Sequence, residues 1–505
     1  MTASARAVVD LDVRGDRISR HIYGHFAEHL GRCIYEGFWV GEDSPIPNVR
    51  GIRSDVVEAL RALDIPNLRW PGGCFADTYH WRDGVGPRDA RPKIANTNWG
   101  DVVESNHFGT HEFLDLCEML GADAYINGNV GSGTVQEMSE WVEYVTRGDD
   151  SPMARLRREN GREEPWVVPF WGIGNEPWGC GGNMSAGFYA EQARRYATYC
   201  HDHGANRLTL IAAGANEDDV EWTRVLVKSL VDSHVATLYD NLSYQAVSFH
   251  FYTHSGSGIN SESALPFSET QFYDTMAYAR GIERVVRGHV AVVDSYDPDG
   301  RISLVCDEWG TWWTAEEGTN PGFLFQQNTV RDALVAGIHF DVFHRYARRI
   351  SMANIAQTVN VLQAMILTDG ENLVLTPTYH VFEMNKGHQD ALSLPAFVVE
   401  TPLATARGGE LPLVSMSAST KDDTALISLT HMSYDEDCTV RIDLRGRAAT
   451  VARARVLGGA SPSDHNDPAS PSRVAPQPLQ TVQEAGELIV TLPPHSFSTI
   501  ELELA

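Results

Sequence analysis

The sequence predicts a (β/α)8 TIM barrel joined to a second, smaller all-β sandwich domain of jelly-roll type. The chain has 505 residues, which is more than one hydrophobic core usually organises. From residue 20 to residue 384, short apolar runs of strand composition alternate with longer segments whose apolar residues recur at helical spacing. From residue 385 onward the apolar period changes to two, which is typical of half-buried strands.

The barrel prediction depends on eight candidate strands, each separated from the next by a segment long enough for a crossover helix. These strands end near Glu28, Arg69, Asn129, Glu176, Asn216, Tyr252, Glu308 and Gln357. The segment 54–63 illustrates the helices, because it starts with a serine and places its apolar residues on one stripe. We expect further helices at 107–120 and 186–203.

A doubly wound nucleotide-binding sheet is the alternative architecture. That fold needs a G-x-G-x-x-G motif after its first strand, so that the backbone can approach a pyrophosphate. No such motif follows the first strand, and the glycines at 128–133 have the wrong spacing. The sequence therefore favours the barrel.

The all-β domain is predicted from alternating runs at 425–429, 439–444 and 488–492. The segment 7–13 also has strand character, and we expect it to join this domain. The predicted domains are therefore a barrel over 20–384 and a sandwich formed by 1–19 together with 385–505. Within the predicted sandwich, the stretch 458–484 is rich in Pro, Ser, Ala and Asp and is expected to be a surface loop.

Charge and cysteine content exclude several classes of protein. The formal net charge of -27 disfavours nucleic acid and anionic membrane partners. Neither a secretory signal nor a membrane-spanning stretch is visible. The seven cysteines are scattered and form no C-x-x-C pair, which favours reduced thiols in a cytoplasmic protein over a disulfide framework or a zinc site.

Two carboxylates carry the chemical prediction. Glu176 closes the fourth strand and Glu308 the seventh, and the carboxyl ends of all strands of a parallel barrel meet at one mouth. A lone glutamate there would be interpreted as a solvated charge, but a facing pair is sufficient to cleave a glycosidic bond without a metal or cofactor. For a retaining mechanism we expect the two carboxyl groups to lie about 5 Å apart.

The sequence is less compatible with two other classes of function. A carbohydrate-binding barrel without catalysis is disfavoured by the presence of both glutamates. A metal-dependent barrel hydrolase is disfavoured because no cluster of His and Asp closes the strands. His21, His25 and His29 recur every four residues, a spacing that suits metal ligands on a helix, but this segment is predicted to be a strand and turn. We therefore expect His25 and His29 to be hydrogen-bonding groups of the pocket. His111-Glu112 lacks the second histidine of a metalloprotease motif.

The motifs resemble a known family. Gly174-Asn175-Glu176-Pro177 and Asp307-Glu308-Trp309 resemble the acid/base and nucleophile motifs of the large clan of retaining glycosidases built on this barrel. More narrowly, the stretches 23–32 (YGHFAEHLGR), 69–73 (RWPGG) and 356–360 (AQTVN) resemble the α-L-arabinofuranosidases of glycoside hydrolase family 51. The resemblance spans the whole barrel in chain order.

This resemblance implies an exo-acting enzyme that removes terminal non-reducing α-L-arabinofuranosyl groups from small oligosaccharides, with Glu176 as acid/base and Glu308 as nucleophile. It implies a homo-oligomer, often a hexamer. It also implies an arabinose pocket formed by Glu28, Arg69, Asn175, His250, Tyr252 and Gln357, with Trp99 and Trp312 as aromatic platforms or as apolar packing. Cys74 belongs to the same implied pocket, but many members have Asn at this position, which leaves the fine sugar specificity open. The alternative is the same mechanism on a galactofuranoside, xyloside or β-glucan.

Elementary chemistry fits these implied roles. Asn175 can donate a hydrogen bond to the sugar 2-hydroxyl, and Tyr252 can orient the nucleophile. We expect Arg69 to lower the pKa of Glu308, and the charge of Glu308 to raise the pKa of Glu176. A purely structural salt bridge is the alternative role for Arg69.

Overall fold

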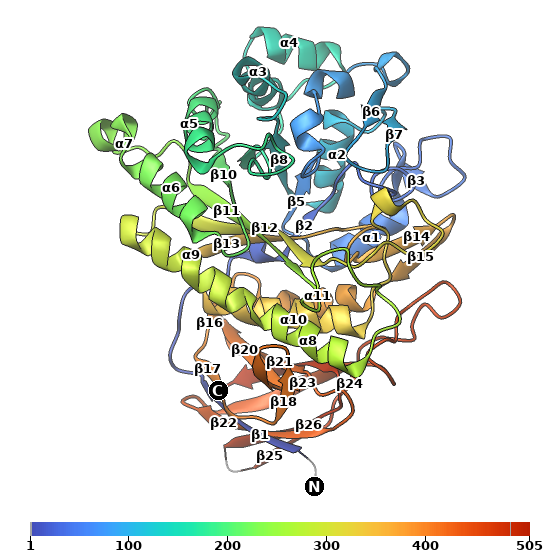
Figure 1. The fold of residues 1–505 in the computed structure, drawn as a ribbon, viewed down its shortest axis with the longest axis vertical. Helices are drawn as coiled ribbons and strands as arrows, with labels where there is room; N and C mark the ends of the chain where they lie inside the picture. The colour runs from blue at the N-terminus through green and yellow to red at the C-terminus, as the bar shows by residue number, and fades with distance from the viewer. Residues whose placement is uncertain (1–2, 485) are drawn as a thin grey trace.

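The computed structural model describes residues 3–484 and 486–505 and contains a closed barrel of eight parallel strands (Figure 1). The order around the barrel is β10-β11-β12-β13-β2-β5-β8-β9, so each strand lies beside its neighbour in sequence. The predicted fold class is therefore confirmed. The barrel strands are β2 (Gly24–Phe26), β5 (Asn67–Trp70), β8 (Asp123–Gly128), β9 (Phe170–Ile173), β10 (Thr209–Asn216), β11 (Ala246–Thr253), β12 (Ser303–Thr311) and β13 (Ile350–Ile355).

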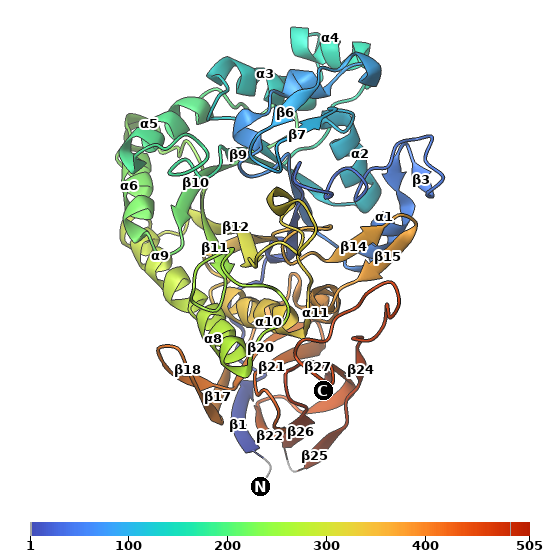
Figure 2. The same cartoon turned by 45° about the vertical axis from the view of Figure 1, so that its right-hand side comes forward.

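Helices cover the outside of the barrel (Figure 2), and most of them pack apolar side chains against it, whereas the short α7 buries no residue. They are α1 (Ser54–Ala62), α2 (Thr110–Leu120), α3 (Val135–Thr146), α4 (Pro152–Glu159), α5 (Ala186–Ala197), α6 (Val220–Val231), α7 (His234–Tyr239), α8 (Glu269–Arg280), α9 (Ile282–Tyr296), α10 (Val330–Arg345) and α11 (Pro377–Asn385). Short strands in the loops are β3 (Asn48–Val49), β4 (Ile52–Arg53), β6 (Ile94–Asn96), β7 (Val102–Glu104), β14 (Ile366–Asp369) and β15 (Asn372–Leu375).

Two predicted helices differ at their ends. The helix expected over 107–120 starts at Thr110, because the backbone N–H of Gly109 donates to Glu112 Oε2 at 2.9 Å and so marks the helix start. The helix expected over 186–203 ends at Ala197. There the chain turns, because Tyr199 and Cys200 donate to carbonyls only three residues earlier.

Two sheets whose neighbouring strands are mostly antiparallel form the second domain, at the lower end of Figure 1. One has the order β17-β1-β22-β26-β25 and the other β16-β20-β21-β27-β23-β24, while β18 and β19 pair with each other as a separate two-stranded sheet. The strands are β1 (Ala3–Asp10), β16 (Leu392–Ser393), β17 (Ala396–Glu400), β18 (Leu403–Ala406), β19 (Gly409–Pro412), β20 (Val414–Lys421), β21 (Thr424–His431), β22 (Cys438–Arg445), β23 (Ala449–Leu457), β24 (Gln477–Pro478), β25 (Thr481–Glu484), β26 (Glu487–Leu492) and β27 (Ser496–Leu504). Alternating apolar side chains from both sheets form a separate core.

The N-terminal strand belongs to this second domain, as expected, although it spans Ala3–Asp10 rather than 7–13. It pairs parallel with β22 and antiparallel with β17. We propose residues 20–384 for the barrel and residues 1–19 with 385–505 for the sandwich. The stretch 458–484 is mostly loop, but its last part forms β24 and β25, and the carbonyls of Pro462 and Asp464 accept from the first N–H groups of α10.

The two domains pack closely through α10. A Cβ atom on Gly337 would lie 2.7 Å from Thr430 Oγ1 and 2.8 Å from Phe497, so only glycine allows this approach of helix to sheet. Beside it, Tyr23 and Ser417 contact the two ring nitrogens of His344 at 2.8 and 3.0 Å. Within the described residues, no helix has the length and apolar character needed to cross a membrane.

Candidate active site

Glu176 and Glu308 lie together at the carboxyl end of the barrel. Glu176 follows β9, and Glu308 lies near the end of β12. One oxygen of each carboxylate and a ring nitrogen of His250 all lie within 4.8 Å of one another. This short separation is the spacing typical of retaining rather than inverting glycosidases.

Different partners hold the two carboxylates. Glu308 Oε1 accepts from Arg69 Nη1 at 2.9 Å, and Oε2 accepts from the Tyr252 hydroxyl at 2.8 Å. Glu176 Oε1 lies 2.8 Å from His250 Nδ1, while Oε2 has no nitrogen or oxygen partner from the protein among the described residues. Glu308 is thus held at both oxygens, whereas Glu176 keeps one oxygen for another group.

Arg69 links Glu308 to Asn175. Its side chain is buried in the barrel and donates to Glu308, to Asn175 Oδ1 at 2.7 Å and to the carbonyl of Asp307 at 3.1 Å. Burial opposes the charge of Arg69, but Asp307 and Glu308 outweigh it and raise its pKa, so the guanidinium stays charged. With its Oδ1 occupied in this way, Asn175 presents its amide NH2 as a donor.

Glu28 forms a second polar cluster beside the first. Its Oε1 accepts from the backbone N–H groups of Gly73 and Phe75 at 2.9 and 3.2 Å and from Trp99 Nε1 at 2.9 Å, and its Oε2 accepts from Gln357 Nε2 at 2.8 Å. Burial, assisted by the charge of Glu308, raises the pKa of Glu28 to about 7.

The Pro-Gly-Gly segment passes close to both acidic clusters. A Cβ atom on Gly72 would lie 2.6 Å from the Glu28 side chain, and one on Gly73 would lie 2.6 Å from Glu308 Oε1. Only glycine lets the backbone approach the carboxylates so closely. This explains the two glycines of the motif 71–73.

Burial and neighbouring charges shift the pKa values of Glu176 and His250. Burial raises the pKa of Glu176, and the negative charge of Glu308 adds to this effect, while His250 opposes it. The expected direction is therefore present, although burial is the larger cause. Burial disfavours the charged form of His250, but Glu308, Asp307 and Glu176 outweigh it and raise its pKa to about 10. These carboxylates favour the imidazolium form of His250, whose Nδ1 faces Glu176 Oε1.

Asp307 is a residue of this site to which the sequence analysis assigned no role. It is buried; its Oδ2 accepts from Tyr125 at 2.7 Å, and its Oδ1 lies 3.2 Å from His250 Nε2. Burial opposes its ionisation, but Arg69 and His250 lower the pKa of Asp307 to about 2. Consecutive residues of a strand normally face opposite sides, but a bulge in β12 places both Asp307 and Glu308 near Arg69.

The aromatic residues expected at the pocket differ in their partners. Trp99 is half-buried and donates to Glu28. Trp312 is also half-buried and packs edge-on against Tyr252, with ring centres 4.8 Å apart. Both therefore contact side chains of the candidate site, at Glu28 and at Tyr252.

Cys74 corrects the prediction of reduced thiols, because it forms a disulfide with Cys180. The two residues are 106 positions apart, and only the barrel brings the loops after β5 and β9 together, so spacing in the sequence carried no signal for this bond. The other five cysteines are free and buried. Within the described residues, Cys180 is exposed at the mouth and Cys74 is partly buried.

The histidines singled out by their spacing lie away from the carboxylates. His29 stacks on Phe75 at 4.7 Å and His25 packs against Phe382 at 5.1 Å. Both rings are buried and make no hydrogen bond among the described residues, and the nearest polar contact of His29 is with Glu104 at 3.8 Å, so the expected role as pocket hydrogen-bonders is wrong. His25, in β2, packs against a residue of α11, whereas His29, which follows β2, packs against a residue of the loop after β5.

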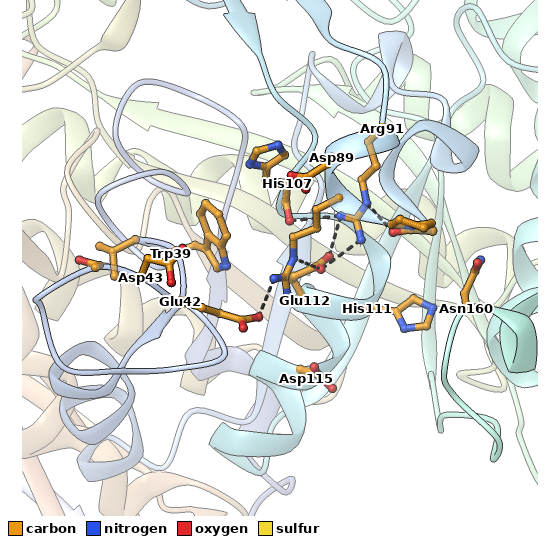
Figure 3. A pocket seen from close by; sticks show the side chains of 16 residues that line it. Trp39, Glu42, Asp43, Asp89, Arg91, His107, His111, Glu112, Asp115 and Asn160 are labelled. Atoms are coloured by element: carbon orange, nitrogen blue, oxygen red, sulfur yellow. Dashed lines mark hydrogen bonds and ion pairs between the residues drawn. The ribbon is translucent and has the colours of Figure 1, made fainter.

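A separate polar cavity of about 680 Å³ lies beside the barrel between the 39–44 loop and α2 (Figure 3). Its buried carboxylate Glu112 is already paired, with Arg88 at 2.9 Å and with Arg91 at 3.0 Å. His111, adjacent to Glu112 in sequence, instead contacts the Tyr144 hydroxyl at 2.6 Å. Neither residue belongs to a possible metal-binding group within the described part of the chain.

Comparisons with known proteins agree with this geometry. Two family models match, the α-L-arabinofuranosidase 1 domain over residues 59–257 and the α-L-arabinofuranosidase C-terminal domain over residues 307–496. An intracellular exo-α-L-arabinofuranosidase of Bacteroides ovatus is 48% identical over 502 residues, which cover 99% of this chain and 96% of that protein. α-L-Arabinofuranosidase C of Emericella nidulans is 33% identical and covers 88% of each chain.

Solved structures give the same result. The GH51 arabinofuranosidase from Xanthomonas axonopodis pv. citri superimposes with a TM-score of 0.95 at 44% identity, over 99% of this chain and 100% of that one. The α-L-arabinofuranosidase from Thermotoga maritima, solved as an arabinose complex, gives 0.83 at 31% identity, with the same coverage. On this fold, this site and these relatives, the chain belongs to the α-L-arabinofuranosidases of glycoside hydrolase family 51.

Proposed function

We propose that this α-L-arabinofuranosidase acts by double displacement, with Glu308 as nucleophile and Glu176 as acid/base. The observation that carries the assignment is the pair of carboxylate oxygens within 4.8 Å, one carboxylate bound by Arg69 and Tyr252 and the other with an oxygen left open. Glu28, Asn175 and Gln357 are proposed to bind the hydroxyls of the arabinofuranosyl ring, with His250 as a group that acts mainly on Glu176.

In the first step, protonated Glu176 donates its proton to the departing glycosidic oxygen while a Glu308 oxygen bonds to the anomeric carbon. The aglycone leaves as an alcohol, and a glycosyl-enzyme ester remains. In the second step, Glu176, now a carboxylate, removes a proton from water, and the water oxygen replaces Glu308 at the anomeric carbon. The raised pKa of Glu176 supports this double role, because burial and the charge of Glu308 favour the protonated form that the first step needs.

The test compares Glu176→Ala with Glu308→Ala on two arabinofuranosides, one with a dinitrophenyl and one with an alkyl leaving group. Removal of the acid spares the dinitrophenyl substrate, since a good leaving group needs little protonation, whereas removal of the nucleophile abolishes turnover of both. Added azide is expected to restore activity to Glu176→Ala with retained configuration. Equal losses on both substrates by Glu176→Ala would contradict the assignment.

We also propose that the enzyme works inside the cell and as a homo-oligomer, with a hexamer as the expected assembly. The first proposal is supported by the intracellular relative of 48% identity. Analytical ultracentrifugation and cell fractionation test these two proposals. The proposed substrates are small arabinose-containing oligosaccharides, and a panel of aryl furanosides and pyranosides tests whether arabinofuranose is preferred over galactofuranose, xylose and glucose.

A further inference from the structure

The two sulfur atoms at the mouth of the barrel lie against the open oxygen of Glu176. Cys180 Sγ is 3.6 Å and Cys74 Sγ 4.0 Å from Glu176 Oε2. A disulfide sulfur carries no proton, so these are contacts and not hydrogen bonds. Oε1 is held by His250, and as a result Oε2 is the oxygen that faces the sulfurs.

Reduction of the disulfide changes which ligands Cys74, Cys180 and Glu176 can bind together. A dithiol reductant transfers two electrons and two protons to the disulfide, closes its own disulfide, and leaves Cys74 and Cys180 as thiols. Two thiolates and one carboxylate are a donor set that zinc and cadmium prefer, with a fourth position open to water. The protons of the two thiols are released when the metal binds.

The distances suit such an ion. With Zn–S bonds of about 2.3 Å and a Zn–O bond of about 2.0 Å in tetrahedral geometry, sulfur and oxygen ligands lie about 3.5 Å apart. The two S···O distances of 3.6 and 4.0 Å are already close to that value. Only the two sulfurs must separate, to about 3.8 Å for the same bond lengths. Their Cα atoms are 5.5 Å apart, so rotation of the side chains is enough.

We propose that, once the disulfide is reduced, Cys74, Cys180 and Glu176 form a binding site for one zinc or cadmium ion, and that the bound ion inactivates the enzyme. The inactivation rests on the proposed acid/base role of Glu176, whereas the binding does not. With Oε2 on the metal and Oε1 on His250, Glu176 is locked as a carboxylate and has no proton to donate.

Other groups compete poorly for the ion. The five remaining cysteines are buried, and burial raises the pKa of Cys33 and Cys200 to about 12 and that of Cys438 to about 11. Glu176, His250 and Glu308 also converge within 4.8 Å, but both ring nitrogens of His250 already contact carboxylates. That second group is present in both redox states, so the oxidised enzyme serves as its control.

The experiment uses the full-length enzyme in two states, oxidised, and reduced with dithiothreitol and then desalted without oxygen. Each is dialysed against cadmium chloride, and bound cadmium, ultraviolet thiolate-to-cadmium absorption and activity are measured. We expect one cadmium ion per reduced chain, none in the oxidised chain, and an activity loss that follows occupancy, reaches at least about 10-fold and is reversed by EDTA. Equal binding in both states, or no binding after reduction, would overturn the proposal.

Variants identify the ligands. The double variant Cys74→Ser/Cys180→Ser is expected to lose the cadmium absorption, while Cys200→Ser, which removes a buried thiol, keeps it. Glu176→Gln retains both thiols and should bind cadmium at least about 10-fold more weakly, since the anionic ligand is lost. Unchanged affinity in Glu176→Gln would remove Glu176 from the site. An error in the acid/base assignment would show separately, in the leaving-group test on metal-free enzyme.

Discussion

His250 Nδ1 lies 2.8 Å from Glu176 Oε1, and the other ring nitrogen lies 3.2 Å from Asp307. The imidazolium therefore connects the candidate acid/base to a buried carboxylate that stays ionised. This arrangement stabilises the carboxylate form of Glu176 and sets the pH at which its proton is lost.

We predict that His250→Asn shifts the basic limb of the kcat/KM profile upward in pH. Loss of the imidazolium removes the group that opposes the raised pKa of Glu176, so Glu176 keeps its proton to higher pH. At neutral pH, kcat should fall by about 100-fold, because the second step needs the carboxylate. The measurement is the pH profile of aryl arabinofuranoside hydrolysis; His254→Asn, at a histidine that contacts neither Glu176 nor Glu308, should leave it in place.

Arg69→Met is predicted to destabilise the protein by about 3–5 kcal/mol, because it leaves the buried carboxylates of Asp307 and Glu308 without their cation. Chemical denaturation followed by tryptophan fluorescence measures the change. Arg20→Met is the matched control: it breaks an exposed pair with Asp390 and should cost less than about 1 kcal/mol. A cost for Arg69→Met as small as that of Arg20→Met would refute a buried ionic role.

Tyr252→Phe is predicted to lower kcat/KM by about 10- to 100-fold. The substitution removes the hydroxyl that donates to Glu308 Oε2, and hydrogen bonds to charged groups are stronger than those between neutral groups. The fold should persist, since the ring still packs against Trp312. Steady-state kinetics and the melting temperature are measured together. An unchanged kcat/KM would show that Glu308 does not need this donor.

Glu28→Gln is predicted to stabilise the protein at pH 8 but not at pH 4.5. The pKa of Glu28 is raised to about 7 in the folded state, so the folded state binds the proton more tightly than the unfolded state, and stability falls as pH rises from about 4.5 to about 7. Above pH 7 the cost is complete, on the order of 3 kcal/mol. An amide avoids it, and Gln357, whose Oε1 accepts no hydrogen bond among the described residues, can turn to accept from the new NH2.

Melting temperatures at both pH values measure the Glu28 effect. Glu36→Gln is the control, because its side chain is 70% exposed and the same substitution there should shift stability little at either pH. If Glu28→Gln and wild type differed by the same amount at pH 4.5 and at pH 8, the titration of Glu28 would not be the cause.

Local sequence patterns determined the eight barrel strands, the change to period two near residue 385 and the strand-end positions of Glu176 and Glu308. These features follow from the order of apolar and polar side chains over a short stretch of sequence. The sequence also predicted that these two glutamates lie near each other, because every parallel strand of a barrel ends at the same mouth.

Only the tertiary structure decided three other features. These are the bulge in β12 that brings Asp307 near Arg69, the bond between Cys74 and Cys180, and the packing of His25 and His29 against aromatic rings; all depend on neighbours far along the chain. Which face a side chain takes, and which loop it meets, is set by the register of adjacent strands and the closure of the barrel. That information is distributed over the whole chain, so no single motif contains it.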